Sequence, residues 1–316
     1  MNPSRLVTGS ALSVTLALSL GPAGAQASAD ASADAGTTPV GRIQWLMTEE
    51  PSRPDGAGEV RLSPTEKLLA YLARAWPAVA QTLVSANIKR SMQMLEGGEH
   101  ACHASLVRTP ERERLLYFAN TVVLPPQQLV MRAADAARLP RNTAGEVDLA
   151  ALLARPRLRG ALIEGRSYGQ TVDRMIARRP ADSGLQLYSL RGYAGGRLLP
   201  MLSMERIDYT MEYPGVLAML QARTPDMTAL RGLPVQGSSE LLRIGVACPR
   251  TPWGLAAAQG VDRVLGTPEG AAMLRASIEV LLTPDLGAAQ RARLEAFFRA
   301  RARPMPVSTA PAASPR

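Results

Sequence analysis

Short apolar runs that fit strands alternate along this chain with stretches whose apolar residues recur at helical spacing. One helix is marked at its start by Ser63-Pro64-Thr65-Glu66, a capping box with proline at the first helical position. Strands are predicted at 41–47, 80–85, 101–106, 115–118, 128–131, 159–164, 185–189, 207–213 and 241–248, and helices at 64–76, 88–95, 170–178, 196–204, 215–222, 253–265, 267–282 and 286–301. This alternation predicts an α/β fold with mostly parallel sheets, and its division into two blocks indicates two lobes.

The first residues have the layout of a cleavable export signal. Arg5 precedes an apolar run at 12–20, and Ala23-Gly24-Ala25 fits a small-x-small cleavage site. The apolar run is shorter than the roughly 20 residues that span a bilayer. We therefore expect residues 1–25 to be a signal peptide and the mature protein to be periplasmic. Residues 26–40 and 303–316 are too poor in apolar side chains to order themselves, and we expect a disordered linker and a disordered tail.

The net charge of +9 does not indicate a nucleic-acid partner. Lys67 and Lys89 are the only lysines, the arginines are scattered, and the chain has three phenylalanines with which to stack bases. The arginine and alanine preference of a GC-rich genome explains this composition, so we expect no nucleic-acid binding.

The segment Gly165-Arg166-Ser167-Tyr168-Gly169 matches the Gly-x-Ser-x-Gly pattern of hydrolases, between a predicted strand and a predicted helix. In that fold the catalytic histidine follows the serine, whereas both histidines here precede it. The same loop feeds a helix N-terminus, where backbone N–H groups, the Ser167 hydroxyl and the Arg166 charge can hold an anion. A plain strand–helix turn remains the alternative.

His100, Cys102 and His103 are side chains that can bind metals, but the chain offers no further histidine to complete a zinc site. We therefore expect no metal and no cofactor.

The stretch 95–118, which contains Thr109-Pro110-Glu111-Arg112, resembles the first-lobe signature of type II periplasmic solute-binding proteins, the amino-acid-binding components of ABC uptake systems. Residues 159–165 are similar to the first strand of that family's second lobe, and 204–209 to a later strand. The motifs at 165–169, 206–209 and 247–254 resemble an uncharacterised proteobacterial subgroup. The resemblance covers nearly all of 41–300.

The resemblance implies a two-lobed periplasmic binding protein-like II fold, with lobe 1 at 41–130 and 236–302 and lobe 2 at 131–235. Extended crossings near 128–131 and 233–236 would form the hinge. The implied function is reversible capture of a small polar solute, such as an amino acid or another carboxylate, by a monomer without catalysis, with an inner-membrane ABC permease as candidate partner. A non-transport periplasmic sensor or accessory protein of the same fold is the alternative.

The family pattern places Arg112 in the cleft, where its planar guanidinium would bind a carboxylate, with Ser105 as a second donor. Glu212 is the candidate acceptor of a ligand ammonium group, although strand alternation leaves open which face of 207–213 meets the cleft. We expect Asp208 to make a structural hydrogen bond and Arg114 to lie at the surface. The candidate ligand contacts are completed by Arg166, Ser167, Tyr168 and Trp45.

This sequence departs from the family at two places. Val107 stands where amino-acid binders often have serine, and the loop after the first strand is 49–52 rather than an aromatic-rich segment.

The family topology also makes the strands of Cys102 and Cys248 neighbours in one sheet, which implies a disulfide in an oxidising compartment. Two unpaired buried thiols are the alternative.

Overall fold

The computed structural model describes residues 39–52, 62–190, 194–284 and 286–309. The predicted signal peptide and nearly all of the predicted linker lie outside these residues.

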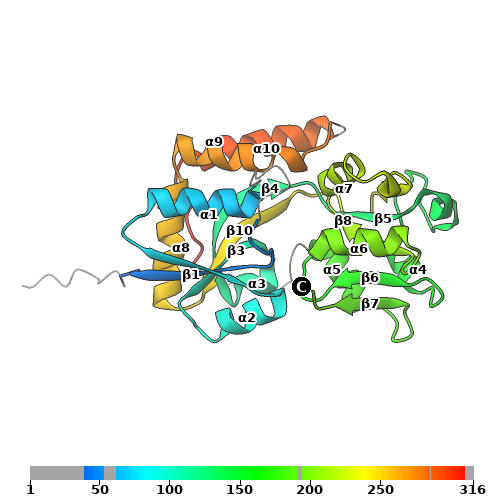
Figure 1. The fold of residues 1–316 in the computed structure, drawn as a ribbon, viewed down its shortest axis with the longest axis horizontal. Coiled ribbons are helices and arrows are strands. Elements are labelled where there is room, and N and C mark those ends of the chain that lie inside the picture. Colours follow the sequence, from blue (N-terminus) through cyan, green and yellow to red (C-terminus); the bar gives the residue numbers. More distant parts are fainter. Residues whose placement is uncertain (1–38, 53–61, 191–193, 285, 310–316) are drawn as a thin grey trace, which may run out of the picture. The chain divides into compact units, whose positions relative to one another are not determined.

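A first sheet has the strand order β2-β1-β3-β10-β4 (Figure 1). Its strands are β1 (Arg42–Met47), β2 (Ala80–Ser85), β3 (Ala101–Val107), β4 (Leu116–Leu124) and β10 (Leu242–Pro249). One face shares an apolar core with α1 (Pro64–Ala75), α8 (Pro252–Leu265), α9 (Pro268–Ser277) and α10 (Ala288–Arg301). The other face packs against α2 (Ile88–Glu96) through Met94 and Leu95.

A second sheet has the order β7-β6-β8-β5-β9. Its strands are β5 (Gln128–Arg132), β6 (Gly160–Ile163), β7 (Leu185–Tyr188), β8 (Tyr209–Glu212) and β9 (Leu230–Leu233). Helices α4 (Leu149–Leu153) and α5 (Gln170–Ala177) share a core with one face, and α6 (Ala194–Ser203) and α7 (Pro214–Gln221) with the other. The two-sheet α/β architecture predicted from the sequence is confirmed.

The mostly parallel strand direction predicted for the sheets is confirmed, because four of the five described strands in each sheet run the same way and one runs opposite. In the first sheet β10 is inserted between β3 and β4 and runs opposite to both. In the second sheet β5 is inserted between β8 and β9 in the same way. The strand–helix alternation predicts the direction of strands joined by helices, but not that of an inserted strand.

Two connections join the sheets. Residues 125–127 link β4 to β5, and residues 234–241 link β9 to β10. The predicted crossings at 128–131 and 233–236 thus adjoin or overlap β5 and β9, which pair with each other within the second sheet.

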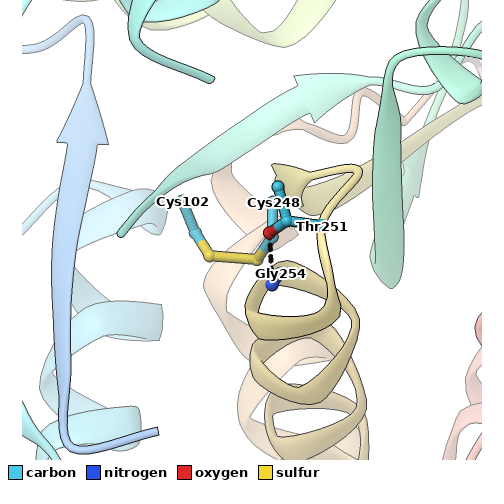
Figure 2. Close-up of a disulfide and its surroundings, with 4 residues drawn as sticks. All are labelled: Cys102, Cys248, Thr251 and Gly254. Atoms are coloured by element: carbon cyan, nitrogen blue, oxygen red, sulfur yellow. Dashed lines mark hydrogen bonds between the residues drawn. A yellow bond between two sulfur atoms is a disulfide. The ribbon is translucent and has the colours of Figure 1, made fainter. Parts of the chain in front are cut away.

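The predicted disulfide between Cys102 and Cys248 is confirmed (Figure 2). It joins neighbouring strands, since β3 and β10 pair antiparallel and Ala247 faces His103. The two Cα atoms lie 4.3 Å apart, although the residues are 146 positions apart in the sequence. Helix α8 begins beside the bond, where the Gly254 N–H donates to the Thr251 hydroxyl at 3.1 Å.

The chain after α10 contacts the first sheet's core as far as it is described. Val307 packs against that core, and a guanidinium N–H of Arg250 donates to the Thr309 carbonyl at 2.6 Å. Part of the segment predicted to be a disordered tail therefore has defined contacts. In the described part of the chain, no helix has both the length and the apolar character needed to cross a membrane.

Candidate functional site

The Arg112 side chain is hydrogen-bonded to residues that adjoin both sheets. It lies in the single-turn helix α3 (Pro110–Glu113), which the Thr109 hydroxyl caps by accepting the Arg112 N–H. Its guanidinium donates to the Val107 carbonyl at the end of β3, at 2.7 Å, and to the Gly165 carbonyl beyond β6, at 2.8 Å. Arg112 is only 9% exposed.

The Arg112 charge has no direct carboxylate partner among the described residues, because no ion pair in that part of the chain includes it. Burial lowers the pKa of Arg112, and the more distant charges of Asp173 and Glu111 act in the opposite direction. A buried guanidinium that is hydrogen-bonded to two carbonyls keeps an unneutralised positive charge, so it can bind an anion.

The glycine-bounded loop between β6 and α5 has the tight geometry expected for it. Gly165 and Gly169 have φ angles of 77° and 93°, a region that glycine adopts without strain. The loop's donors already have a partner within the chain. The Tyr168 N–H and the Ser167 hydroxyl both donate to the carboxylate of Asp173, at 2.7 and 2.5 Å, so Asp173 stands where we expected an external anion.

Arg166 and Glu212 form a two-pronged ion pair. The guanidinium nitrogens lie 2.8 and 3.2 Å from the two carboxylate oxygens, and the Glu212 side chain is 1% exposed. The guanidinium carbon of Arg166 also lies 5.5 Å from the ring centroid of both Tyr168 and Tyr213. Burial alone would lower the pKa of Arg166, but the charge of Glu212 and the hydrogen bonds to it raise that pKa.

Two further contacts connect α2 with the loops of the second sheet. The Lys89 ammonium lies 3.1 Å from a carboxylate oxygen of Glu164, and the Asn87 amide donates to the Ser189 hydroxyl at 3.1 Å. Together with the Arg112–Gly165 bond, these contacts hold side chains of both sheets around one site.

The structure brings five of the seven candidate ligand contacts into this region: Arg112, Arg166, Ser167, Tyr168 and Glu212. Trp45 lies elsewhere, because it is 1% exposed in the core of the first sheet and its indole N–H donates to Gln81 at 2.8 Å. Ser105 is exposed on β3, and its backbone N–H donates to Nδ1 of His103.

Asp208 has the structural contacts expected of it. It forms ion pairs with Arg132 and Arg159 and accepts the Arg159 backbone N–H. Burial opposes ionisation, but the hydrogen bonds from Arg159 and Arg132 lower the pKa of Asp208 to about 2.

Sequence reasoning missed three side chains here: Asp173, Tyr213 and His103. Alternation along a strand over 207–213 would put Tyr213 on the face opposite Glu212. In the structure β8 ends at Glu212 and Tyr213 is the N-cap of α7, so the alternation does not extend to Tyr213. An acidic residue in the first turn of the helix that follows a glycine-bounded loop was the available signal for Asp173.

The residues considered for a hydrolase site and for a metal site do not come together as either kind of site would require. Ser167 donates to Asp173 rather than to a histidine. Cys102 is in the disulfide, His100 stacks on Trp253 at 4.5 Å between centroids, and His103 is buried.

No protein-family model and no curated protein sequence matches the chain. Solved structures do. An amino acid ABC transporter substrate-binding protein from Streptococcus pneumoniae, AbpA bound to L-arginine, is similar over 77% of this chain and 97% of its own, at 13% identity and a TM-score of 0.55. A putative L-cystine ABC transporter protein from Listeria monocytogenes is similar over 77% and 96%, at 16% identity and a TM-score of 0.56. A histidine kinase sensor domain with similarity to periplasmic binding proteins matches over 80% and 94%, at 17% identity and a TM-score of 0.50.

At these identities the likeness is one of fold. The chain therefore has the type II periplasmic-binding-protein-like fold, as the resemblance implied.

Proposed function

We propose that this protein is a periplasmic solute-binding protein that captures a small polar solute, an amino acid or another carboxylate, without catalysis. The fold supports this proposal, because similar structures are those of substrate-binding proteins of amino-acid ABC transporters. The export-signal pattern at residues 1–25 supports the periplasmic location.

The observation that carries the proposal is the position of Arg112. Its guanidinium is buried, contacts a carbonyl on each side of the site, and has no anionic partner among the described residues. A carboxylate ligand would supply that partner through charge-assisted hydrogen bonds. In our proposal Arg112 is the principal ligand contact, and Arg166, Ser167, Tyr168 and Glu212 shape the site around it.

Capture and release would follow from motion of the lobes about the two connections at 125–127 and 234–241. We further propose that the protein acts as a monomer and delivers its solute to an ABC permease in the inner membrane.

A second candidate is a periplasmic sensor or accessory protein of the same fold, which would bind without transport. The similarity in fold to a histidine kinase sensor domain supports this second candidate. Genes for a permease and an ATPase beside this gene would favour transport, and a neighbouring gene for a signalling protein would favour sensing.

The proposal is tested by a thermal-shift screen of the mature chain against amino acids and small organic anions, with uncharged sugars as controls. A ligand that binds only the folded state stabilises it by about 2.7 kcal/mol at a concentration of about 100 times its Kd. We expect a rise in Tm with at least one carboxylate and none with the sugars. No rise with any compound that carries a carboxylate would contradict the proposal.

A further inference from the structure

The carboxylates in the region of Arg112 that are at least partly buried already have partners within the chain. Glu212 is held by both prongs of Arg166, and Asp173 accepts the Ser167 hydroxyl and the Tyr168 N–H. Glu164, which is one-third exposed, pairs with Lys89. Glu111 also acts on the charge of Arg112, but it is exposed, where solvent screens it.

This distribution of charge is unsuited to a zwitterion. An amino acid brings a carboxylate, which Arg112 can meet, and an ammonium group, which needs an anionic partner once it is removed from water. The most deeply buried carboxylate of this group, Glu212, is neutralised by Arg166, whose guanidinium also lies against the rings of Tyr168 and Tyr213. An ammonium would have to displace a desolvated guanidinium that makes two hydrogen bonds at once.

We propose that the site accepts a small carboxylate that carries no α-ammonium group, and that Arg166 enforces this selectivity by occupying Glu212 from within the chain. The inference rests on the proposed function and narrows its ligand class. Arg166 acts as a specificity-determining residue, and the ligand's charge is matched by Arg112 alone.

The first test measures Kd by calorimetry for pairs of compounds that share a carbon skeleton: propionate and alanine, succinate and aspartate, glutarate and glutamate. For whichever pair binds, the wild-type protein should prefer the compound without the amino group by roughly 100-fold, the scale for an unpaired desolvated charge. Equal affinities, or a preference for the amino acid, would overturn the inference and leave the proposed function standing. If no carboxylate binds, neither in these pairs nor in the thermal-shift screen, both the inference and the proposed function are overturned.

The second test removes the internal occupant. Arg166→Gln frees Glu212, so affinity for the amino acid should rise and the preference should shift toward it by about tenfold or more. Arg166→Gln combined with Glu212→Gln should not gain that affinity. The matched control is Arg159→Gln, which breaks an arginine–carboxylate pair with Asp208, the residue just before β8, and should keep the wild-type preference.

Arg166→Lys retains a cation beside Glu212 and should also keep the wild-type preference. Its ligand preference can be measured even if Arg166→Gln does not fold. An unchanged preference in a folded Arg166→Gln protein would contradict the role given to Arg166. An amino-acid preference in Arg166→Lys would contradict it equally.

Discussion

At the scale of single residues, His103 is a buried group whose protonation the folded state resists. It is 1% exposed, and burial together with the charge of Arg112 lowers its pKa to about 3 from an ordinary 6.5. Its Nδ1 accepts the Ser105 N–H, which fixes the neutral ring with the remaining proton on Nε2.

The lowered pKa predicts a dependence of stability on pH. Between pH 6.5 and about 3 the unfolded chain binds a proton at His103 that the folded chain does not, so stability is full above 6.5 and falls as the pH drops through this window. The loss should approach about 1.4 kcal/mol per pH unit. Urea unfolding at several pH values should show this slope in the wild type and a shallower one in His103→Gln, with exposed His100→Gln as control. Equal slopes in the wild type and His103→Gln would contradict the assignment.

The sequence alone indicated the positions of some of the side chains near the candidate site, but not of others. Arg112 could be placed because a family motif and a charge requirement coincide there. Trp45 was misplaced because an aromatic residue on a strand suits a core as well as a ligand site, and its burial in the core that the first sheet shares with α1 and α8 depends on tertiary packing. The Arg166–Glu212 pair could not be predicted from residues 46 positions apart, since both were considered only as partners of a ligand.

At the scale of elements, the bond between Cys102 and Cys248 fixes β10 to β3. β10 is the strand that enters the first sheet after the chain leaves the second, so the disulfide anchors that return. The sequence could supply this pairing only through the family topology, because spacing alone says nothing about which strands are neighbours.

Loss of this bond should destabilise the protein by about 5 kcal/mol in the chain-entropy model, because a long loop is released in the unfolded chain. We expect Cys102→Ser combined with Cys248→Ser to lower the free energy of unfolding by that amount, and so to lower the denaturant midpoint, without changing the fold seen by circular dichroism. Wild-type protein treated with reductant should approach the same midpoint, whereas reductant should not affect the double variant. A wild-type midpoint that reductant leaves unchanged, with two titratable thiols, would argue against a stabilising bond.

Helices and strands whose ends are marked by neighbouring residues were mostly predicted from the sequence. The capping box at the start of α1 is present, with the Glu66 N–H donating to the Ser63 hydroxyl and the Ser63 N–H to the Glu66 carboxylate. Short elements such as α3 and β9 were missed, since four residues carry too little periodicity to be recognised. The antiparallel insertion of β5 and β10 is a property of the whole sheet and has no local signature.

At the scale of the whole molecule, two sheets place buried charges of both signs around one site. The positive charge of Arg112 is the unpaired member of that group among the described residues, whereas Arg166, Glu212 and Asp173 are satisfied within the chain. Fold and charge together lead to the proposal of a solute-binding protein, and the internal pairing leads to the narrower proposal of an anion without an ammonium group.

The central claim is that Arg112 binds the carboxylate of the ligand, and calorimetric titration of Arg112→Ala with the best compound from the screen tests it most directly. We expect binding to weaken by about 2–4 kcal/mol, the scale for losing one partner of a buried charged pair, while exposed Arg114→Ala binds like the wild type. Folding of each variant is checked by its thermal unfolding without ligand. An Arg112→Ala protein that is folded and binds with wild-type affinity would contradict the account.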